Sequence, residues 1–345
     1  MIRIATYNVE WFSVLFDASH HLILDHSWSK RHDVTKRQQI EALATVFREV
    51  DADAVMVVEA PDASGKRSTS DALLNFAEYA GLRLNAVVTG FVSETQQEIA
   101  LLYDARKVSA VHDPQGTDDV DDPAPRFDGK FRMDVDVDGQ PDAHVFSKPP
   151  LEAALRVVGG NLDLRLIGVH VKSKAPYGAK SKKAAARISI ANRRKQLAQC
   201  NWLRRRVVNH LNAGDHVIVL GDFNDGPGLD EYEKLFGKSG VEVVMGNPSE
   251  PETYMFDPHA TARLNPRQAW SPATARFYSK EKQRYFNALL DFVMASPELL
   301  AKHGPNWRIW HPFDDEACFA NPDFANALLT ASDHFPVSID LKLGA

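Results

Sequence analysis

Short apolar runs typical of β-strands alternate with helical patterns along the whole of this 345-residue chain. This alternation restricts the fold strongly, because each strand must bury its apolar face against a neighbouring layer. The runs lie at residues 53–58, 99–103, 164–171, 216–220, 289–294 and 335–341. The sequence has no linker rich in Pro, Gly or Ser and no internal repeat. We therefore predict a layered α/β fold that forms a single domain over residues 1–345.

Two helical patterns are clear between these runs. The first follows Asp33 and Thr35, either of which can cap a helix, and has the apolar residues Ile40, Leu43, Ala44 and Phe47. The second is much longer and should end at Gly214. Its apolar seam consists of Ile190, Leu197, Cys200, Leu203, Val207 and Leu211. Basic residues are expected mostly off this seam: Arg193, Arg194, Lys195, Arg204 and Arg205.

The charge is unevenly spread over the chain, although the net charge is only −6. Residues 113–142 contain ten aspartates and three basic residues, which predicts an exposed loop and a hairpin around Asp138-Gly139. Residues 172–206 contain twelve Lys or Arg and no Asp or Glu. Such a cationic segment would attract an anionic substrate.

Composition excludes several classes of protein. The contents of hydrophobic residues, 44%, and charged residues, 25%, are ordinary for a globular protein. Two cysteines, Cys200 and Cys318, do not make a disulfide framework. The start of the chain does not resemble a signal peptide, and no apolar run approaches the length of a membrane span. We expect a cytoplasmic protein that does not associate with membranes and has no evident obligate protein partner.

Polar residues follow several of the strand-like runs and are the best candidates for a functional site. The runs that contain them are Thr6-Tyr7-Asn8, Gly221-Asp222-Phe223-Asn224-Asp225, Leu290-Asp291-Phe292-Val293 and Ser332-Asp333-His334. Glu59 and His170 each follow a further strand. Any one of these groups alone is more typical of a turn or a helix cap. Together they suggest a site that binds a hard divalent cation and cleaves a phosphate ester.

The chemistry of phosphodiester hydrolysis gives each residue type a role. A catalyst must neutralise charge on the phosphate, activate a water and stabilise the leaving oxygen. Mg²⁺ or Mn²⁺ prefers oxygen ligands, so Glu59 is the best ligand candidate and Asn8 can assist or hold a phosphate oxygen. Asp222 and Asn224 are two residues apart, so in an extended strand they would flank one water.

Histidines and lysines complete the expected set. His334 can donate to a phosphate oxygen if Asp291 keeps it protonated. His170 is the candidate general acid for the leaving oxygen, although a lone His after a strand more often has only a structural role. Lys172 and Lys174 follow it closely and are candidate phosphate-binding residues.

These motifs, in this order, resemble those of the endonuclease/exonuclease/phosphatase superfamily, which has the DNase I-like fold. The resemblance runs from residue 6 to 337. It implies one catalytic domain: a four-layer α/β sandwich of two packed mixed β-sheets flanked by helices, with the site at one end. It implies Glu59 as metal ligand with Asn8 and Asp333 close by. It further implies Asp222 as water activator, Asn224 as phosphate-orienting residue, Asp291 and His334 as a pair, and His170 near the leaving group.

Two departures from the family pattern stand out. Glu59 follows Val57-Val58, whereas many members have Gln before this Glu. In DNase I-like nucleases a carboxylate supports the histidine that matches His170. Here Gln97 falls at that place with Glu98 next to it, so the partner of His170 stays open.

The fold alone does not choose a substrate. The basic segment beside His170 favours nucleic acid, and we expect a metal-dependent nuclease acting on DNA or RNA. One alternative is a phosphatase or phosphodiesterase of a small or lipid-derived phosphate, and another is an inactive phosphate-binding homologue. Two long segments, residues 247–285 and 307–329, should be structured functional loops. A closed pocket formed by the first would favour the small substrate, and an open basic groove would favour the polymer.

Overall fold

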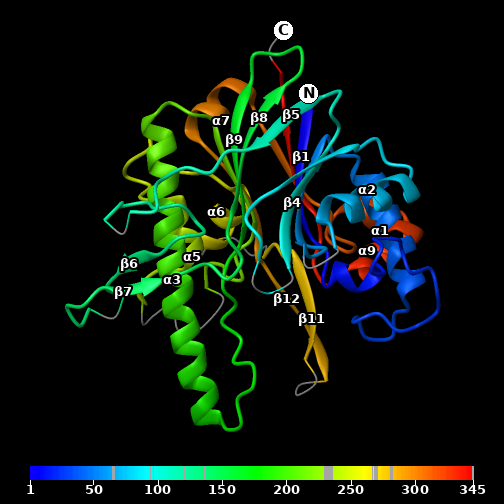
Figure 1. Ribbon diagram of the computed structural model, residues 1–345, viewed down its shortest axis with the longest axis horizontal. Coiled ribbons are helices and arrows are strands. Elements are labelled where there is room, and N and C mark those ends of the chain that lie inside the picture. Colours follow the sequence, from blue (N-terminus) through cyan, green and yellow to red (C-terminus); the bar gives the residue numbers. More distant parts are fainter. Residues whose placement is uncertain are drawn as a thin grey trace.

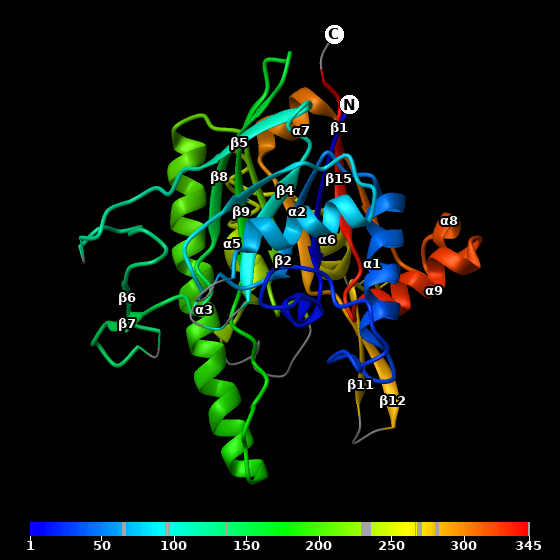
Figure 2. The same ribbon diagram turned by 45° about the vertical axis from the view of Figure 1, so that its right-hand side comes forward.

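The computed structural model describes residues 1–343 except 64–66, 94, 96, 120, 136, 229–235, 266, 268–270 and 280–282. Two mixed β-sheets pack face to face, and helices cover the outer face of each (Figures 1 and 2). The predicted four-layer α/β sandwich is therefore confirmed.

The first sheet has six strands and contains both ends of the chain. Its order is β14 (Asn306–Ile309), β15 (Val337–Leu341), β1 (Ile2–Asn8), β2 (Ala54–Ala60), β4 (Glu98–Tyr103) and β3 (Ala86–Thr89). Only β1 and β2 are parallel neighbours, and every other pair is antiparallel.

The second sheet has five strands and the same mixed character. Its order is β13 (Asp291–Ala295), β10 (Val217–Asp222), β9 (Asp163–His170), β8 (Leu151–Val157) and β5 (Val108–His112). Here β9 and β10 form the parallel pair. Two hairpins lie outside the sheets: β6 (Phe131–Met133) with β7 (Asp142–His144), and β11 (Ala275–Ser279) with β12 (Arg284–Ala288). The β6–β7 hairpin is the one that we expected around Asp138-Gly139.

Helices form the two outer layers. The first sheet is covered by α1 (Lys36–Val50), α2 (Thr69–Tyr79) and α9 (Pro322–Ala331), and the second by α3 (Lys182–Asn212), α5 (Gly240–Met245) and α6 (Pro258–Leu264). Shorter elements are η1 (Phe12–Leu15), α7 (Pro297–His303) and α8 (Glu316–Phe319). Thr35 caps α1 in a reciprocal arrangement with Gln38. No helix in the described part of the chain is long and apolar enough to cross a bilayer.

Strand alternation positions the site. Ile4 on β1, Leu166 on β9 and Leu220 on β10 all point into the core between the two sheets. The same alternation brings Asp222, two residues after Leu220, and His170, four residues after Leu166, to the end of that core. Asn8 lies four residues after Ile4 on the same face. The inner faces of the two sheets therefore turn from apolar to polar at one end of the sandwich.

The long helix differs from its prediction in one respect. It ends before Gly214 as predicted, but Arg193 is fully buried instead of lying off the seam. Burial of this guanidinium is compensated by Lys238, whose carbonyl oxygen accepts from Nη2 at 2.7 Å, and by Asp225 at 3.7 Å. The charge of an arginine predicts an exposed position, but an arginine whose guanidinium has partners inside the protein can be buried.

The two expected long loops contain regular structure. Residues 247–285 include α6 and the strand β11, and residues 307–329 include most of β14, α8 and most of α9. Pro258 and Pro322 occupy the first turns of α6 and α9, where proline is tolerated. The expectation of loops over these residues therefore missed two helices that begin with a proline.

Candidate active site

Three of the expected site residues lie in one row across neighbouring strands. Asp222 at the end of β10 is paired in register with His170 on β9 and with Asp291 on β13. All three point into the space between the sheets, so their side chains converge without any loop rearrangement. Residues 121 positions apart in the sequence thus form one polar row.

Asp222 is held by two asparagines. Its Oδ2 accepts from Nδ2 of Asn8 and from Nδ2 of Asn224, each at 3.0 Å. Its Oδ1 accepts from the backbone N–H of Asn224 at 2.7 Å. Asn224 has a positive φ of 49°, so the strand has already turned there. The two residues meet through this Asx-type turn and not through the extended spacing that we expected.

Burial raises the pKa of Asp222 to about 6. The positive charge of His334 opposes this shift, and the negative charge of Asp291 adds to it. The carboxylate is therefore ionised at neutral pH but considerably more basic than an exposed aspartate.

His334 forms the expected pair with Asp291. Its Nδ1 lies 2.7 Å from Oδ2 of Asp291, and both residues are buried. Burial alone would lower the pKa of His334, but Asp291, with Asp222 and Asp333 further off, raises that pKa well above the ordinary value. His334 is consequently an imidazolium whose Nδ1–H donates a hydrogen bond to Asp291.

Glu59 reaches the site through a β-bulge. The pairing of β2 with β4 shifts register between Val58 and Ala60, and Glu59 has a positive φ of 59°. Val57 and Ala60 both lie in the core under the helices, so the bulge inserts Glu59 as an extra residue and re-aims it. Its Oε2 accepts from the backbone N–H of Trp11 at 2.8 Å.

A second carboxylate pair lies beside this group. Glu10 contacts Asp333, whose backbone N–H donates to Glu10 at 3.3 Å, and Glu10 is ion-paired with Arg31. Burial and the neighbouring Asp333 raise the pKa of Glu10 to about 7, against the opposing effect of Arg31. Burial raises the pKa of Asp333 as well. Two crowded carboxylates with raised pKa values are a feature of sites that bind cations.

The oxygen donors fit a hard divalent cation. Oδ1 of Asp333 and Oδ1 of Asp291 are buried and have no hydrogen-bond partner among the described residues. Glu59, Asn8, Glu10 and Asp333 line one cavity of about 560 Å³. Carboxylate and amide oxygens are the ligands that such a cation prefers. A buried group of Asp222, Asp291 and His334 also offers ligand atoms within 4.8 Å of one another.

The partner of His170 is a lysine. Nζ of Lys148 lies 2.9 Å from Nε2 of His170, and Oδ2 of Asp222 lies 3.6 Å from the same nitrogen. Glu98 is used elsewhere, because it accepts from the backbone N–H of Ser93, whereas Gln97 only lines the cavity. The question left open by the sequence therefore has an answer that differs from the family pattern.

Both members of this pair have lowered pKa values. Burial, with the positive charges of Lys148 and His334, holds the pKa of His170 well below its usual range. Burial lowers the pKa of Lys148 to about 8, against the opposing effect of Glu59 and Asp222. His170 is thus neutral near pH 7, and Lys148 is the positively charged partner.

The two lysines after His170 have different surroundings. Lys172 lines the cavity. Lys174 donates to Oδ1 of the buried Asp225 at 2.6 Å and is absent from the cavity wall. Sequence reasoning missed Glu10 and Lys148, although Glu10 lies two residues after Asn8 and Lys148 directly precedes Pro149-Pro150.

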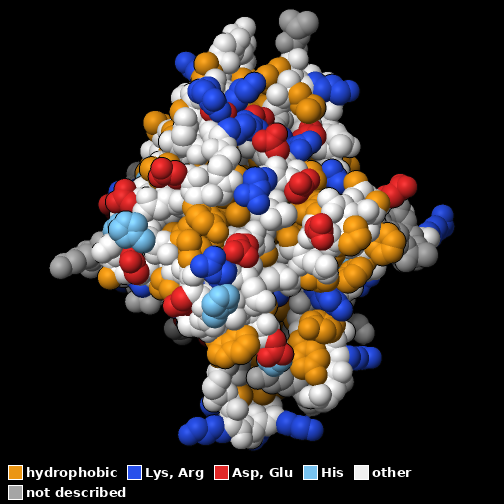
Figure 3. Space-filling model, turned by 90° about the vertical axis from the view of Figure 1, so that its right-hand side faces the viewer, with side chains coloured by type: hydrophobic (Ala, Val, Ile, Leu, Met, Phe, Trp, Pro, Cys, Tyr) orange, Lys and Arg blue, Asp and Glu red, His pale blue; other side chains and the backbone are white. Residues whose placement is uncertain are grey.

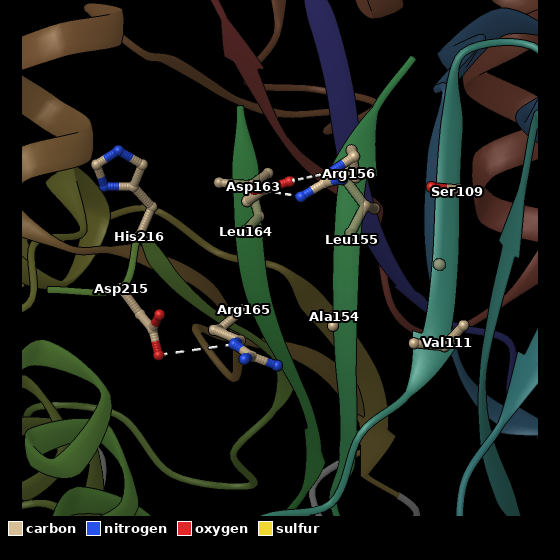
Figure 4. Close-up of a pocket in the computed structure, with 11 residues that line it drawn as sticks. Ser109, Val111, Ala154, Leu155, Arg156, Asp163, Leu164, Arg165, Asp215 and His216 are labelled. Carbon is tan, nitrogen blue, oxygen red and sulfur yellow. Dashed lines mark hydrogen bonds and ion pairs between the residues drawn. The ribbon is translucent and has the colours of Figure 1, made fainter. Parts of the chain in front are cut away.

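A second cavity of about 400 Å³ lies at the opposite end of the second sheet (Figure 4). Its charged residues are paired with each other: Arg156 with Asp163 at 2.6 Å and Arg165 with Asp215 at 3.6 Å. It contains none of the candidate site residues, which lie at the first cavity instead.

A family model for the endonuclease/exonuclease/phosphatase family matches residues 5–334. The chain belongs to this family, whose members hydrolyse phosphoric esters. No curated protein matches the chain.

Solved structures share the fold at low sequence identity. An endonuclease/exonuclease/phosphatase from Bacteroides vulgatus is 13% identical with a TM-score of 0.51, covering 99% of each chain. A humanised Danio rerio TDP2 is 12% identical with a TM-score of 0.50, covering 99% of this chain and 98% of the other. An AP endonuclease from Archaeoglobus fulgidus is 14% identical with a TM-score of 0.46, covering 99% and 100%. At these identities the first two likenesses show a shared fold and nothing about the activity of this chain.

Proposed function

We propose that the protein is a divalent-metal-dependent phosphodiester hydrolase that cleaves nucleic acid. One observation carries the proposal: the basic carboxylate of Asp222 lies between two asparagines and beside the protonated His334–Asp291 pair. The same cavity is lined by Asp333, whose buried Oδ1 has no hydrogen-bond partner among the described residues. This arrangement combines a base, a cationic donor and ligands for a cation within one space.

The metal ligands in this proposal are Glu59, Asn8 and Asp333, with Glu10 beside them. The protonated His334 cannot ligate a cation, which argues against the group of Asp222, Asp291 and His334 as the ligand set. Mg²⁺ or Mn²⁺ bound there would neutralise negative charge on the scissile phosphate.

Asp222 and Asn224 act on the attacking water. A carboxylate with a pKa of about 6 is ionised at neutral pH and is a stronger base than an ordinary aspartate. Asn224 holds Asp222 in place and orients the water or the phosphate. Nε2 of the protonated His334 donates to a non-bridging phosphate oxygen, and Asp291 keeps that proton in place.

His170 and Lys148 act together at the leaving oxygen. Because Lys148 carries the proton of this pair, it stabilises or protonates the departing oxygen, and His170 positions its ammonium group. This assignment moves the general acid from His170, the expected residue, to its neighbour.

The substrate class rests on charge. Lys172 lines the cavity, and the basic segment continues into α3 with exposed Lys182, Lys183 and Arg187. Lys174 is held by Asp225, so we assign substrate contact to Lys172. A polyanion can use such an extended field, whereas a small phosphate ester cannot. Hydrolysis of a small or lipid-derived phosphate is the alternative.

The test is hydrolysis by the purified protein with Mg²⁺ or Mn²⁺ on supercoiled DNA, single-stranded DNA, RNA and small phosphomonoesters. EDTA and His334→Ala are the controls. Metal-dependent cutting of a polymer that is lost in the variant supports the proposal. Release of phosphate from small esters alone would favour the alternative, and no hydrolysis with any substrate would favour an inactive phosphate-binding protein.

A further inference from the structure

The hairpin of β11 and β12 projects from the end of the sandwich that contains the site (Figures 1 and 2). Its base is anchored there, because Ala275 bridges to His334 and the backbone N–H of Arg276 donates to the carbonyl oxygen of Asp333 at 2.7 Å. Phe277 lines the catalytic cavity, and its ring centroid lies 5.6 Å from that of His334. The hairpin therefore continues the wall of the site outward.

The two faces of this hairpin carry different side chains. Phe277 is opposite Phe286, and Tyr278 is opposite Tyr285, so the phenylalanines share one face and the tyrosines the other. The rings of Phe277 and Phe286 lie 5.4 Å apart. Phe286 therefore lies beside Phe277 on the same face of the hairpin, although it does not line the cavity itself. Its side chain is 49% exposed, which leaves much of an apolar ring in solvent.

A basic wall lies on another side of the cavity. Lys172 and Tyr177, which follow β9, line the cavity, and Tyr177 is 81% exposed. From there the chain enters the basic half of α3, which projects at the same end of the molecule as the hairpin (Figures 1 and 2). On the face shown in Figure 3, hydrophobic side chains gather toward this lower end, and Lys or Arg side chains lie at its lowest point. The cavity thus opens between aromatic rings and positive charges.

We propose that the Phe277–Phe286 face stacks an unpaired base next to the scissile phosphate, so that the substrate is single-stranded nucleic acid or an unpaired end. This inference rests on the proposed function. In a duplex the faces of the bases are covered by their neighbours, and a projecting aromatic hairpin could reach only base edges and backbone. In a single strand the faces are free, and aromatic rings bind them beside a positively charged groove.

The chemistry of the rings also bears on selectivity. Phenylalanine has no hydrogen-bonding group in its side chain, so this face can recognise a base only by stacking. Stacking is tolerant of sequence because every base offers a π-face. We therefore expect a preference for unpaired strands with little preference among sequences.

A binding measurement tests the inference independently of catalysis. Wild-type protein and Phe286→Ala are titrated into a fluorescent single-stranded oligonucleotide and into its duplex, with EDTA present to prevent cleavage. We expect tighter binding of the single strand by the wild type and roughly tenfold weaker binding by the variant. Phe286→Trp should restore binding. Phe319→Ala, which removes a 65% exposed ring on α8, is the matched control and should bind like the wild type.

Turnover of bis(p-nitrophenyl) phosphate with Mn²⁺ separates this inference from the proposed function. Normal turnover by Phe286→Ala with weakened single-strand binding supports the inference. Equal single-strand binding by wild type and Phe286→Ala would overturn it even if the enzyme is active. Absent turnover with ring-dependent single-strand binding would remove the proposed function but retain the stacking surface. Binding to anionic phospholipid vesicles that depends on Phe286, without single-strand binding, would assign the hairpin to a membrane surface and overturn the inference.

Discussion

At the scale of single residues, the site depends on pairs whose members shift each other's protonation. Asp291 holds a proton on the buried His334, and burial makes Asp222 a stronger base. Lys148 lies against a neutral His170 and carries the charge of that pair. At neutral pH His334 and Lys148 are therefore protonated and Asp222 is ionised. One site can then contain both a proton donor and a proton acceptor, which acid–base catalysis requires.

The pH dependence of turnover should show the pKa of Asp222. Because this carboxylate must be ionised to act as a base, turnover should fall as the pH decreases below about 6. Turnover should fall again above about pH 8, where Lys148 loses the proton that it supplies to the leaving oxygen. A pH–rate profile with a diester substrate and saturating Mg²⁺ measures this. A profile that is flat from pH 7 to pH 5 would contradict the assignment of Asp222.

Replacing Lys148 by Met should distinguish a general acid from a residue that only binds phosphate. We expect a loss of roughly 10²-fold in kcat on a diester with an alkoxide leaving group. The loss should be much smaller on bis(p-nitrophenyl) phosphate, because p-nitrophenolate leaves without a proton. Steady-state kinetics on both substrates give the comparison. An equal loss on both would assign Lys148 to binding alone.

At the scale of secondary-structure elements, irregular positions bring the side chains together. The bulge at Glu59 and the left-handed residue Asn224 each re-aim a side chain at the end of a strand. On the outer layer, Asp225 joins three segments: it accepts from Lys174 and from the backbone N–H of Gly240, and it lies near Arg193 of α3. The buried ion pair therefore fixes the basic helix α3 relative to strand β10, which carries the proposed catalytic base Asp222.

Replacing Arg193 by Ala should destabilise the protein through this ion pair. The change removes a buried positive charge beside Asp225 and two hydrogen bonds, so we expect a loss of about 3 kcal/mol in the free energy of unfolding. Urea denaturation measures it. Arg194→Ala is the matched control, because this neighbour is exposed and should change stability little. Equal stability of the two variants would contradict the role given to Arg193.

At the scale of the whole molecule, the layered α/β fold and the positions of many strands could be predicted from the sequence, whereas the order of the strands in each sheet could not. Apolar runs predicted most strands of both sheets, and polar residues at the ends of such runs predicted that Asn8, Asp222, Asp291 and His334 lie in one site. That residues 1–345 form a single domain stays a prediction. Glu10 and Lys148 were missed, because their approach to Asp333 and His170 depends on chain paths that periodicity does not encode. The projecting hairpin was hidden for the same reason.

The most direct test of the account is the turnover of Asp222→Asn on a diester substrate with Mg²⁺. Asparagine has nearly the same shape, but it cannot accept a proton from water. We predict a loss of at least about 10²-fold in kcat, with a circular dichroism spectrum and melting temperature close to those of the wild type. A turnover rate equal to that of the wild type would contradict the central claim that Asp222 is the catalytic base.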